Sequence, residues 1–179
     1  NTLSFWETAC DKEAHPYACE NFKRVSFLAC ESNDLHACHN LALSLEESNP
    51  ARAQTLYQVA CQKGQFESCN HLGGMLYKTG EESRDRVIIE KALSVLRVAC
   101  DGDVLEACTR QAMILRSDWI DRSIWTQKEW RLLWSLLERG CEGGEPYACL
   151  ELSQYHLMFL RFDDKNLLFQ MMNLVGQLL

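Results

Sequence analysis

The sequence has 179 residues, with 18 basic and 25 acidic side chains, a net charge of −7 and a pI of about 5.2. This balance argues against nucleic acids and anionic membrane surfaces as partners, because both require clustered Lys and Arg. Hydrophobic residues make up 47% of the chain and charged residues 24%, which is enough apolar material for a continuous core and too little charge for a disordered chain.

No apolar run approaches the roughly 20 residues that a membrane-spanning helix needs, so no membrane span is predicted. The longest late run, residues 167–179, is interrupted by polar side chains. Because the sequence opens at Asn1 rather than at a methionine, we expect a processed or trimmed N-terminus, with any signal sequence outside these residues.

Ten cysteines divide the chain into segments, and they fall into five local pairs. The members stand eight residues apart in four pairs and nine apart in the first. An alanine or glycine precedes each first cysteine, and an alanine or serine precedes each second one. The pairs are Cys10/Cys19, Cys30/Cys38, Cys61/Cys69, Cys100/Cys108 and Cys141/Cys149.

The first predicted element is a helix from about Pro16 to Cys30. Only ten residues separate Cys19 from Cys30, which is too few for two helices, so one helix carries both cysteines. Residues 1–34 are therefore expected to form an irregular helical cap. The pairings Cys10–Cys30 and Cys19–Cys38 remain alternatives to the local ones.

Residues 35–160 are predicted to form pairs of antiparallel helices. First cysteines recur here after 39 and 41 residues, a period typical of αα repeats. A helix, called the A helix, precedes each first cysteine, and its aligned apolar positions lie three and four residues apart, as on the buried face of a helix. These positions are Ala53, Ala92 and Leu133, then Leu56, Val95 and Leu136, then Tyr57, Leu96 and Leu137.

After each second cysteine of the repeats a further helix, the B helix, is predicted. A small residue stands four positions past that cysteine every time, which implies that a neighbouring helix approaches closely. Gly73 and Gly74 lie inside such a helix, where each glycine costs about 1 kcal/mol relative to alanine, so we expect packing to offset this cost. The small residues are Ala42, Gly73, Ala112 and Ser153.

Each first cysteine ends an A helix and each second one opens a B helix, so a disulfide across the turn is expected. Such a bridge needs Cα atoms within about 7 Å, and closing a nine-residue ring stabilises by about 2–3 kcal/mol in the chain-entropy model. Disulfides imply an oxidising compartment. A metal site is not expected, because seven intervening residues are a poor chelate spacing and C-x-x-C is absent.

The junction between the fourth and fifth cysteine pairs carries four of the five tryptophans. We expect these side chains to form an interface, since Trp is enriched at interface hot spots, or to fill the irregular junction. Trp134 aligns with Leu93 and is expected in the core. The candidate interface residues are Trp119, Trp125 and Trp130.

At the C-terminus, Asp163 and Asp164 are predicted to cap a last helix that runs to about Gln177, because acidic residues are favourable at a helix start. Residues 161–179 are expected to cover the end of the helix array as a capping helix. About ten helices and no strand result.

The segment ARAQTLYQVACQKGQFESCNHLGGMLYKTG, from Ala51 to Gly80, resembles the cysteine-rich branch of the Sel-1-like repeats, relatives of the tetratricopeptide repeats. The resemblance covers about Leu35 to Met158. It implies an all-α fold, a short right-handed αα-repeat solenoid with disulfide-stapled helix pairs. In that family each cysteine pair bridges the two helices of one repeat.

Solenoids of helix pairs curve, and A helices typically line the concave surface used for recognition. We therefore expect partner-binding residues at exposed positions of two A helices. These residues are Arg52, Gln54, Gln58 and Arg97.

No catalytic residue is predicted, and no cofactor. Some members of the group that this chain resembles have been described as acting on β-lactams, yet no serine is followed by lysine in S-x-x-K spacing. Lys78-Thr79-Gly80 spells the K-T-G of such enzymes but is predicted to be a glycine C-cap. His39 and His71 are expected at interhelical or surface positions.

We expect a non-enzymatic protein–protein interaction module of an oxidising compartment, the bacterial periplasm or a secreted setting. It would act as an adaptor or host-interaction factor. One alternative is a periplasmic immunity or inhibitor protein that neutralises a toxic effector. A further alternative is an assembly factor of the mitochondrial intermembrane space.

Overall fold

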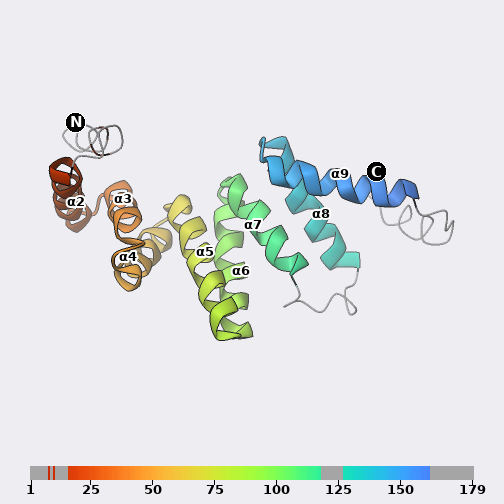
Figure 1. The fold of residues 1–179 in the computed structure, drawn as a ribbon, viewed down its shortest axis with the longest axis horizontal. Helices are drawn as coiled ribbons and strands as arrows, with labels where there is room; N and C mark the ends of the chain where they lie inside the picture. Colours follow the sequence, from red (N-terminus) through yellow and green to blue (C-terminus); the bar gives the residue numbers. More distant parts are fainter. Residues whose placement is uncertain (1–7, 9, 11–15, 118–126, 162–179) are drawn as a thin grey trace. The chain divides into compact units, whose positions relative to one another are not determined.

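The computed structural model describes residues 8, 10, 16–117 and 127–161. Across these residues the protein is all-helical, without a strand (Figure 1). The helices are α2 (Pro16–Glu31), α3 (Leu35–Leu45), α4 (Pro50–Gln62), α5 (Phe66–Ser83), α6 (Arg86–Asp101), α7 (Leu105–Arg116), α8 (Gln127–Glu142) and α9 (Pro146–Arg161).

The helix expected from Pro16 to Cys30 is confirmed, because α2 spans Pro16–Glu31 as one element. Helices are also found where the A and B helices were expected: α4, α6 and α8 end just after the first cysteines, and α5, α7 and α9 begin just before the second ones. We call α4, α6 and α8 A helices and α5, α7 and α9 B helices. The chain forms two compact units, Asn1–Asp103 and Val104–Leu179. The capping helix predicted for residues 163–177 lies outside the described residues.

A repeated turn explains why the cysteines stand eight residues apart. After four of the first cysteines, Cys30, Cys61, Cys100 and Cys141, the third residue has a left-handed backbone, with φ between 64° and 93°. In three of these turns the next residue donates its backbone N–H to the carbonyl just before the cysteine, at 2.9 to 3.0 Å. This is the Schellman arrangement, which ends a helix by satisfying its last carbonyls. The left-handed residues are Asn33, Gly64, Asp103 and Gly144.

The residue after the left-handed position starts the next helix. Asp34 and Gln65 cap α3 and α5, accepting from the backbone N–H groups of Ala37 and Glu67 at 3.1 Å. The second cysteine then sits in the first turn, where the N–H of Cys38 donates to the carbonyl of Asp34. Both cysteines of a pair therefore face each other across the turn.

All ten cysteines are disulfide-bonded. Four bridges join local pairs with Cα–Cα distances of 4.6 to 4.7 Å, well inside the limit that a disulfide needs. The alternatives Cys10–Cys30 and Cys19–Cys38 are therefore wrong. Cys100 and Cys108 are bonded too. The local bridges are Cys10–Cys19, Cys30–Cys38, Cys61–Cys69 and Cys141–Cys149.

One core joins α3 to α6 in the first unit. Its buried residues come from all four helices, and the neighbouring half-buried side chains include Leu56 and Val95, which align in the sequence. In α6 the predicted positions Ala92 and Leu96 are fully buried, so the A-helix stripe is confirmed. The buried members are Ala42, Ala53, Tyr57, Leu72, Leu76 and Ala92.

Close packing at the small residues is confirmed at three of four positions. A Cβ on Gly73 would lie 2.5 Å from Cγ of Leu96, so the missing side chain lets α6 approach α5. Ala42 and Ala112 are fully buried. Ser153 of α9 is exposed and donates to the carbonyl of Leu150. The helix expected to follow α9 lies outside the described residues, so close packing at Ser153 stays a prediction.

The prediction that Gly80 ends a helix was wrong. Helix α5 runs on to Ser83, and the left-handed Arg84 forms its C-cap. Gly80 is instead a close-packing position, because a Cβ there would lie 2.6 Å from Cγ1 of Ile89 on α6. The physical reason is tertiary, since only a glycine lets the start of α6 approach at this point.

In the second unit, α7, α8 and α9 meet at Gly140. A Cβ on that glycine would lie 2.5 Å from Oγ1 of Thr109 and 2.8 Å from Cβ of Ala148. Leu133 and Leu137, at the aligned A-helix positions, are buried on α8. None of the helices within the described ranges is long and apolar enough to cross a bilayer.

Candidate interaction surface

The sequence placed the candidate partner-binding residues on two A helices, and the structure puts them on α4 and α6. Arg52, Gln58 and Arg97 are exposed, whereas Gln54 is half-buried. Three of the four side chains are therefore accessible to a partner, and Gln54 is the least accessible.

The guanidinium of Arg52 lies 5.4 Å from the ring centroid of Phe27 on α2. This is a cation–π distance, so the contact links α2 to α4. Because the ring restricts the side chain, the charge of Arg52 has a defined position.

Exposed positions of α4 and α6 repeat the same residue types. We count positions back from the first cysteine that follows each helix. In both helices the ninth residue before this cysteine is a cation, the sixth is a hydroxyl residue and the second is a valine. All of these residues are exposed. These positions lie three and four apart, on one side of each helix. We call the six residues the A-helix face: Arg52, Thr55 and Val59 on α4, and Lys91, Ser94 and Val98 on α6.

Sequence reasoning missed the valines of this face. Val59 is 40% exposed and Val98 is 46% exposed, and Leu28 at the same position of α2 is 57% exposed. Their position in the sequence could have identified them as exposed. The second residue before the cysteine lies outside the buried stripe of each A helix. An isolated exposed valine needs no explanation, but an exposed apolar residue recurs at this position in α2, α4 and α6, whereas α8 has Arg139 there.

The tryptophan interface stays a prediction. Trp119 and Trp125 lie outside the described residues, and Trp130 lies in α8 with a side chain outside the description. Trp134 is half-buried rather than fully in the core, and its indole N–H donates to the carboxylate of Glu138.

A polar cluster lies between α3, α4 and α5. The hydroxyl of Tyr57 donates to Oε1 of Glu46 at 2.6 Å, and Nδ1 of His71 lies 3.0 Å from the same oxygen. The Tyr57 and His71 rings stack with centroids 5.1 Å apart. His39 completes the cluster, with its ring centroid 5.2 Å from that of His71 and its Nδ1 3.0 Å from Oγ of Ser68.

Burial shifts the pKa values of two groups in this cluster. It lowers the pKa of His39 to about 4, aided by the neighbouring His71, so this ring is neutral at pH 7. Burial and the bond to Glu46 raise the pKa of Tyr57, so its hydroxyl stays protonated and donates. The cluster thus joins α3, α4 and α5. His39 and His71 lie between helices, as was predicted from the sequence.

Ser68 and His39 are as close together as a catalytic serine and its general base, but the serine hydroxyl is not accessible to a substrate. Ser68 is fully buried, so no substrate reaches its hydroxyl in this arrangement. Lys78-Thr79-Gly80 lies within α5, where Oγ1 of Thr79 donates to the carbonyl of Met75. Among the described residues, no group of three or more His, Cys, Asp or Glu could hold a metal ion.

In the second unit, Arg116 at the end of α7 pairs with the buried Glu151 of α9. The same guanidinium donates to the hydroxyl of Tyr147 at 3.2 Å. Burial and the adjacent Glu151 raise the pKa of Tyr147. These contacts fasten α7 to α9.

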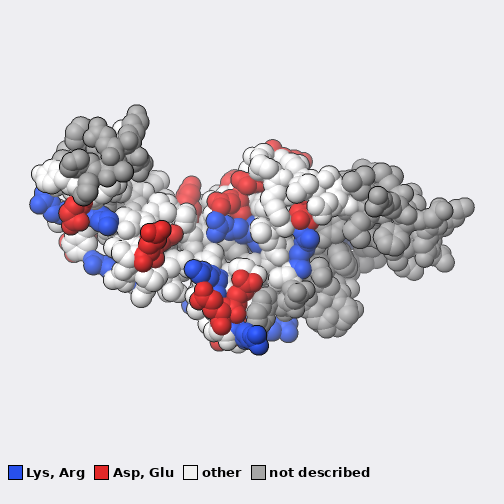
Figure 2. All heavy atoms as spheres, in the orientation of Figure 1, with Lys and Arg blue, Asp and Glu red and all other residues white. Residues whose placement is uncertain are grey.

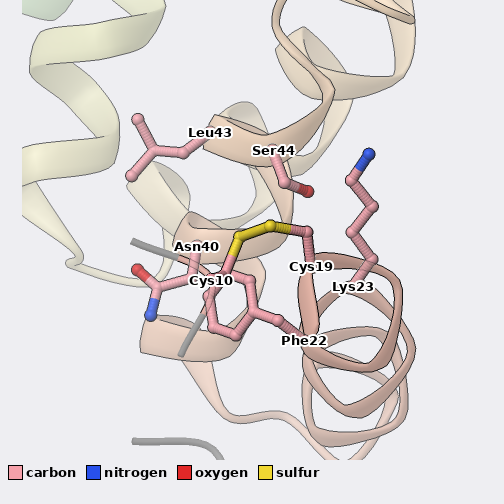
Figure 3. A pocket seen from close by; sticks show the side chains of 7 residues that line it. All are labelled: Cys10, Cys19, Phe22, Lys23, Asn40, Leu43 and Ser44. Atoms are coloured by element: carbon pink, nitrogen blue, oxygen red, sulfur yellow. A yellow bond between two sulfur atoms is a disulfide. The ribbon is translucent and has the colours of Figure 1, made fainter. Parts of the chain in front are cut away.

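A pocket of about 300 Å³ lies where α2 and α3 meet the first disulfide. Figure 3 shows the Cys10–Cys19 bridge in its wall, with Lys23 and Asn40 on opposite sides of the bridge. Its other lining residues are Phe22, Leu43 and Ser44. One ammonium among mainly apolar side chains does not define a ligand.

Surface charge is mixed on the face drawn in Figure 2. Lys and Arg side chains there are interspersed with Asp and Glu rather than gathered in one broad basic patch. This face therefore lacks the basic surface that nucleic-acid binding requires.

No protein-family model matches the chain, and no curated protein matches it. The relationship to the Sel-1-like repeats therefore stays a prediction from the cysteine pattern and the residues around it.

Proposed function

We propose that this protein is a non-enzymatic protein–protein interaction module, built as a short Sel-1-like solenoid for an oxidising compartment. The observation that carries the proposal is the repetition on α4 and α6 of an exposed cation, hydroxyl residue and valine in one register. Nothing in the packing of the core requires these residue types at exposed positions. A surface that binds a partner along successive repeats would present exposed residues in one register.

Disulfide bonding supports the choice of compartment. All ten cysteines are bonded, and disulfides persist in oxidising or extracellular environments. We propose the bacterial periplasm or a secreted setting, with the role of an adaptor or host-interaction factor.

An inhibitor of a toxic effector is the second candidate. It is favoured by the net charge of −7 together with the disulfides across the turns from α2 to α3, α4 to α5 and α8 to α9, because an acidic, rigid protein suits a basic effector. An assembly factor of the mitochondrial intermembrane space is the third, since paired cysteines suit that setting too.

Site-specific photo-crosslinking tests the proposal. A benzoylphenylalanine replaces Thr55 or Ser94 on the A-helix face, and Thr79 on α5 in a control; all three residues are exposed. Irradiation in the periplasmic or secreted fraction of the source should give protein adducts from the first two positions and not from the third. Equal labelling from all three, or no adduct from the face, would refute a protein-binding role for it. The adduct's mass identifies an effector or another partner.

A further inference from the structure

We propose that the Cys10–Cys19 bridge is a covalent modification site, at which a small thiol that carries a further negative charge attacks the disulfide. The product of the first step is a mixed disulfide between Cys10 and the thiol. This inference does not depend on the proposed function, because it concerns the chemistry of one bridge and not the A-helix face.

Burial separates the first bridge from most of the others. Whichever sulfur of a disulfide is attacked, the other one leaves as a thiolate, and an anion that is formed in a buried position is costly. In Cys10–Cys19 and Cys141–Cys149 both cysteines are half-buried, so these two bridges are the accessible ones. The other pairs contain the buried cysteines Cys38, Cys69, Cys100 and Cys108.

A pocket beside the first bridge gives a thiol room to approach. Cys10 and Cys19 both line this cavity of about 300 Å³, and Figure 3 shows the disulfide in its wall. Phe22 and Leu43 add apolar surface, against which the carbon chain of a small molecule would pack. The disulfide itself determines the chemistry of the ligand, because a thiolate is the nucleophile that exchanges with it.

Lys23 adds a positive charge at this bridge. It stands four residues after Cys19 on α2, and side chains four apart on a helix are neighbours on one face. In the four later pairs the same position holds alanine, glycine or serine, so the lysine is particular to the first pair. Lys23 is half-buried and lines the pocket. Its ammonium would attract an anionic thiol and stabilise the thiolate of Cys19.

The charge of Lys23 is not neutralised by a described neighbour. Glu20 lies three residues before it on α2, but Glu20 is exposed and does not line the pocket. Among the described residues, none forms an ion pair with Lys23. The ammonium is therefore available to an anion in the pocket.

The reaction consists of two exchanges. In the first, the thiolate attacks Sγ of Cys10, the bond between the two cysteine sulfurs breaks, and Cys19 leaves as a thiolate beside Lys23. In the second, another thiolate attacks the sulfur of the bound thiol, which releases Cys10 as a thiolate and the two small molecules as their own disulfide. The bridge gains two electrons, which the two small thiols lose. Both cysteine thiolates take up the protons that the small thiols gave to water.

Limited exchange of the full native chain with mercaptoethanesulfonate tests the proposal. Samples are quenched in acid, free thiols are alkylated under denaturing conditions, and the peptides are mapped by mass spectrometry. The adduct should appear first on Cys10, and Cys10–Cys19 should open about threefold or more faster than Cys141–Cys149. The rate should rise in proportion to the thiol concentration. The uncharged 2-mercaptoethanol should react more slowly at an equal concentration of thiolate.

Variants at Lys23 test the role of its charge. Lys23→Gln should slow the opening of the first bridge about threefold or more at low salt, because one nearby charge is lost, and should leave Cys141–Cys149 unchanged. Lys23→Arg keeps the charge and should keep the rate. Lys78→Gln, at an exposed lysine of α5, is the control and should leave both rates unchanged. Thermal melts check that the variants fold.

Each contrary result overturns a defined part. If Cys10–Cys19 opened no faster than Cys141–Cys149 in the parent protein, the first bridge would not be the site. An unchanged rate in Lys23→Gln would refute the role of the lysine, and an adduct on Cys19 alone would refute the direction of attack. If all bridges opened together at a rate independent of thiol concentration, unfolding of the chain rather than the pocket would give access to them. None of these results bears on the A-helix face, which the crosslinks from Thr55 and Ser94 test separately.

Discussion

Tyr57 of α4 and Glu46 at the end of α3 share a 2.6 Å hydrogen bond across the boundary between two helix pairs. The ring of Tyr57 is fully buried, while Glu46 is half-buried. Since an ionised carboxylate only accepts hydrogen bonds, Nδ1 of His71 donates to the same Oε1 atom at 3.0 Å. A single carboxylate oxygen therefore connects α3, α4 and α5.

Removing the Tyr57 hydroxyl should destabilise the protein. We expect Tyr57→Phe to lower the free energy of unfolding by about 1.5 kcal/mol, at the low end for a bond to a charged acceptor, because water reaches Glu46. Tyr77→Phe is the matched control: its hydroxyl donates to Glu81 at 2.6 Å within one helix and at the surface. That change should cost less than about 0.5 kcal/mol. Urea denaturation of both variants measures the difference, and equal losses would contradict a special role for the buried bond.

Stability should fall as the pH drops below neutrality, because of His39. Its pKa is about 4 in the folded protein against 6.5 as the reference value, so the unfolded chain binds more protons between these values. The stabilisation is complete above about pH 6.5 and is lost progressively down to about pH 4. Through this one group, the free energy of unfolding cannot change by more than about 1.4 kcal/mol per pH unit. The partial exposure of the ring makes the change smaller.

The measurement is the free energy of unfolding in urea at several pH values from 4 to 7.5. His39→Gln should flatten the profile in that window, because glutamine bonds to Ser68 without titrating. Parallel profiles for the parent and His39→Gln would show that other groups cause the acid sensitivity.

The left-handed turn position should accept only certain residues. Gly64 has φ = 93°, and Asn33 occupies the equivalent position with φ = 73°. Gly64→Asn should therefore cost less than about 1 kcal/mol, since asparagine tolerates this region, whereas the β-branched Gly64→Val should cost about 2 kcal/mol or more. A Cβ at Gly64 meets nothing within 4 Å, so backbone strain alone would cause the difference. Thermal denaturation compares the two variants, and equal melting temperatures would contradict it.

The turn geometry was predictable because it is local. A cysteine at a fixed distance from the next, with Asn, Gly or Asp between them at one position, determines a helix end and a helix start within nine residues. The buried A-helix stripe was predictable for the same reason, since aligned apolar residues three and four apart define one face.

Contacts between distant residues were not predictable in this way. Glu46 lies 11 residues from Tyr57 and 25 from His71, and no local spacing brings them together. Gly80 was assigned to a helix end because glycine commonly ends helices, whereas its reason here is the approach of Ile89 from the next helix. The exposed valines were overlooked because only polar residues of α4 and α6 were considered as candidates for partner binding.

Removing one disulfide should measurably lower the free energy of unfolding of the protein. Intact mass under denaturing, non-reducing conditions should show no free thiol, since every cysteine is bonded. Removing the Cys61–Cys69 bridge by the double change to alanine should then lower the free energy of unfolding by about 2–3 kcal/mol, the chain-entropy value for a nine-residue ring. The bridge's effect arises mainly in the unfolded chain, so the far-ultraviolet circular dichroism of the folded variant should be unchanged.

A parent protein with ten free thiols would remove the basis for an oxidising compartment. A double variant as stable as the parent would mean that the Schellman turn at Gly64, rather than the disulfide, holds α4 and α5 together.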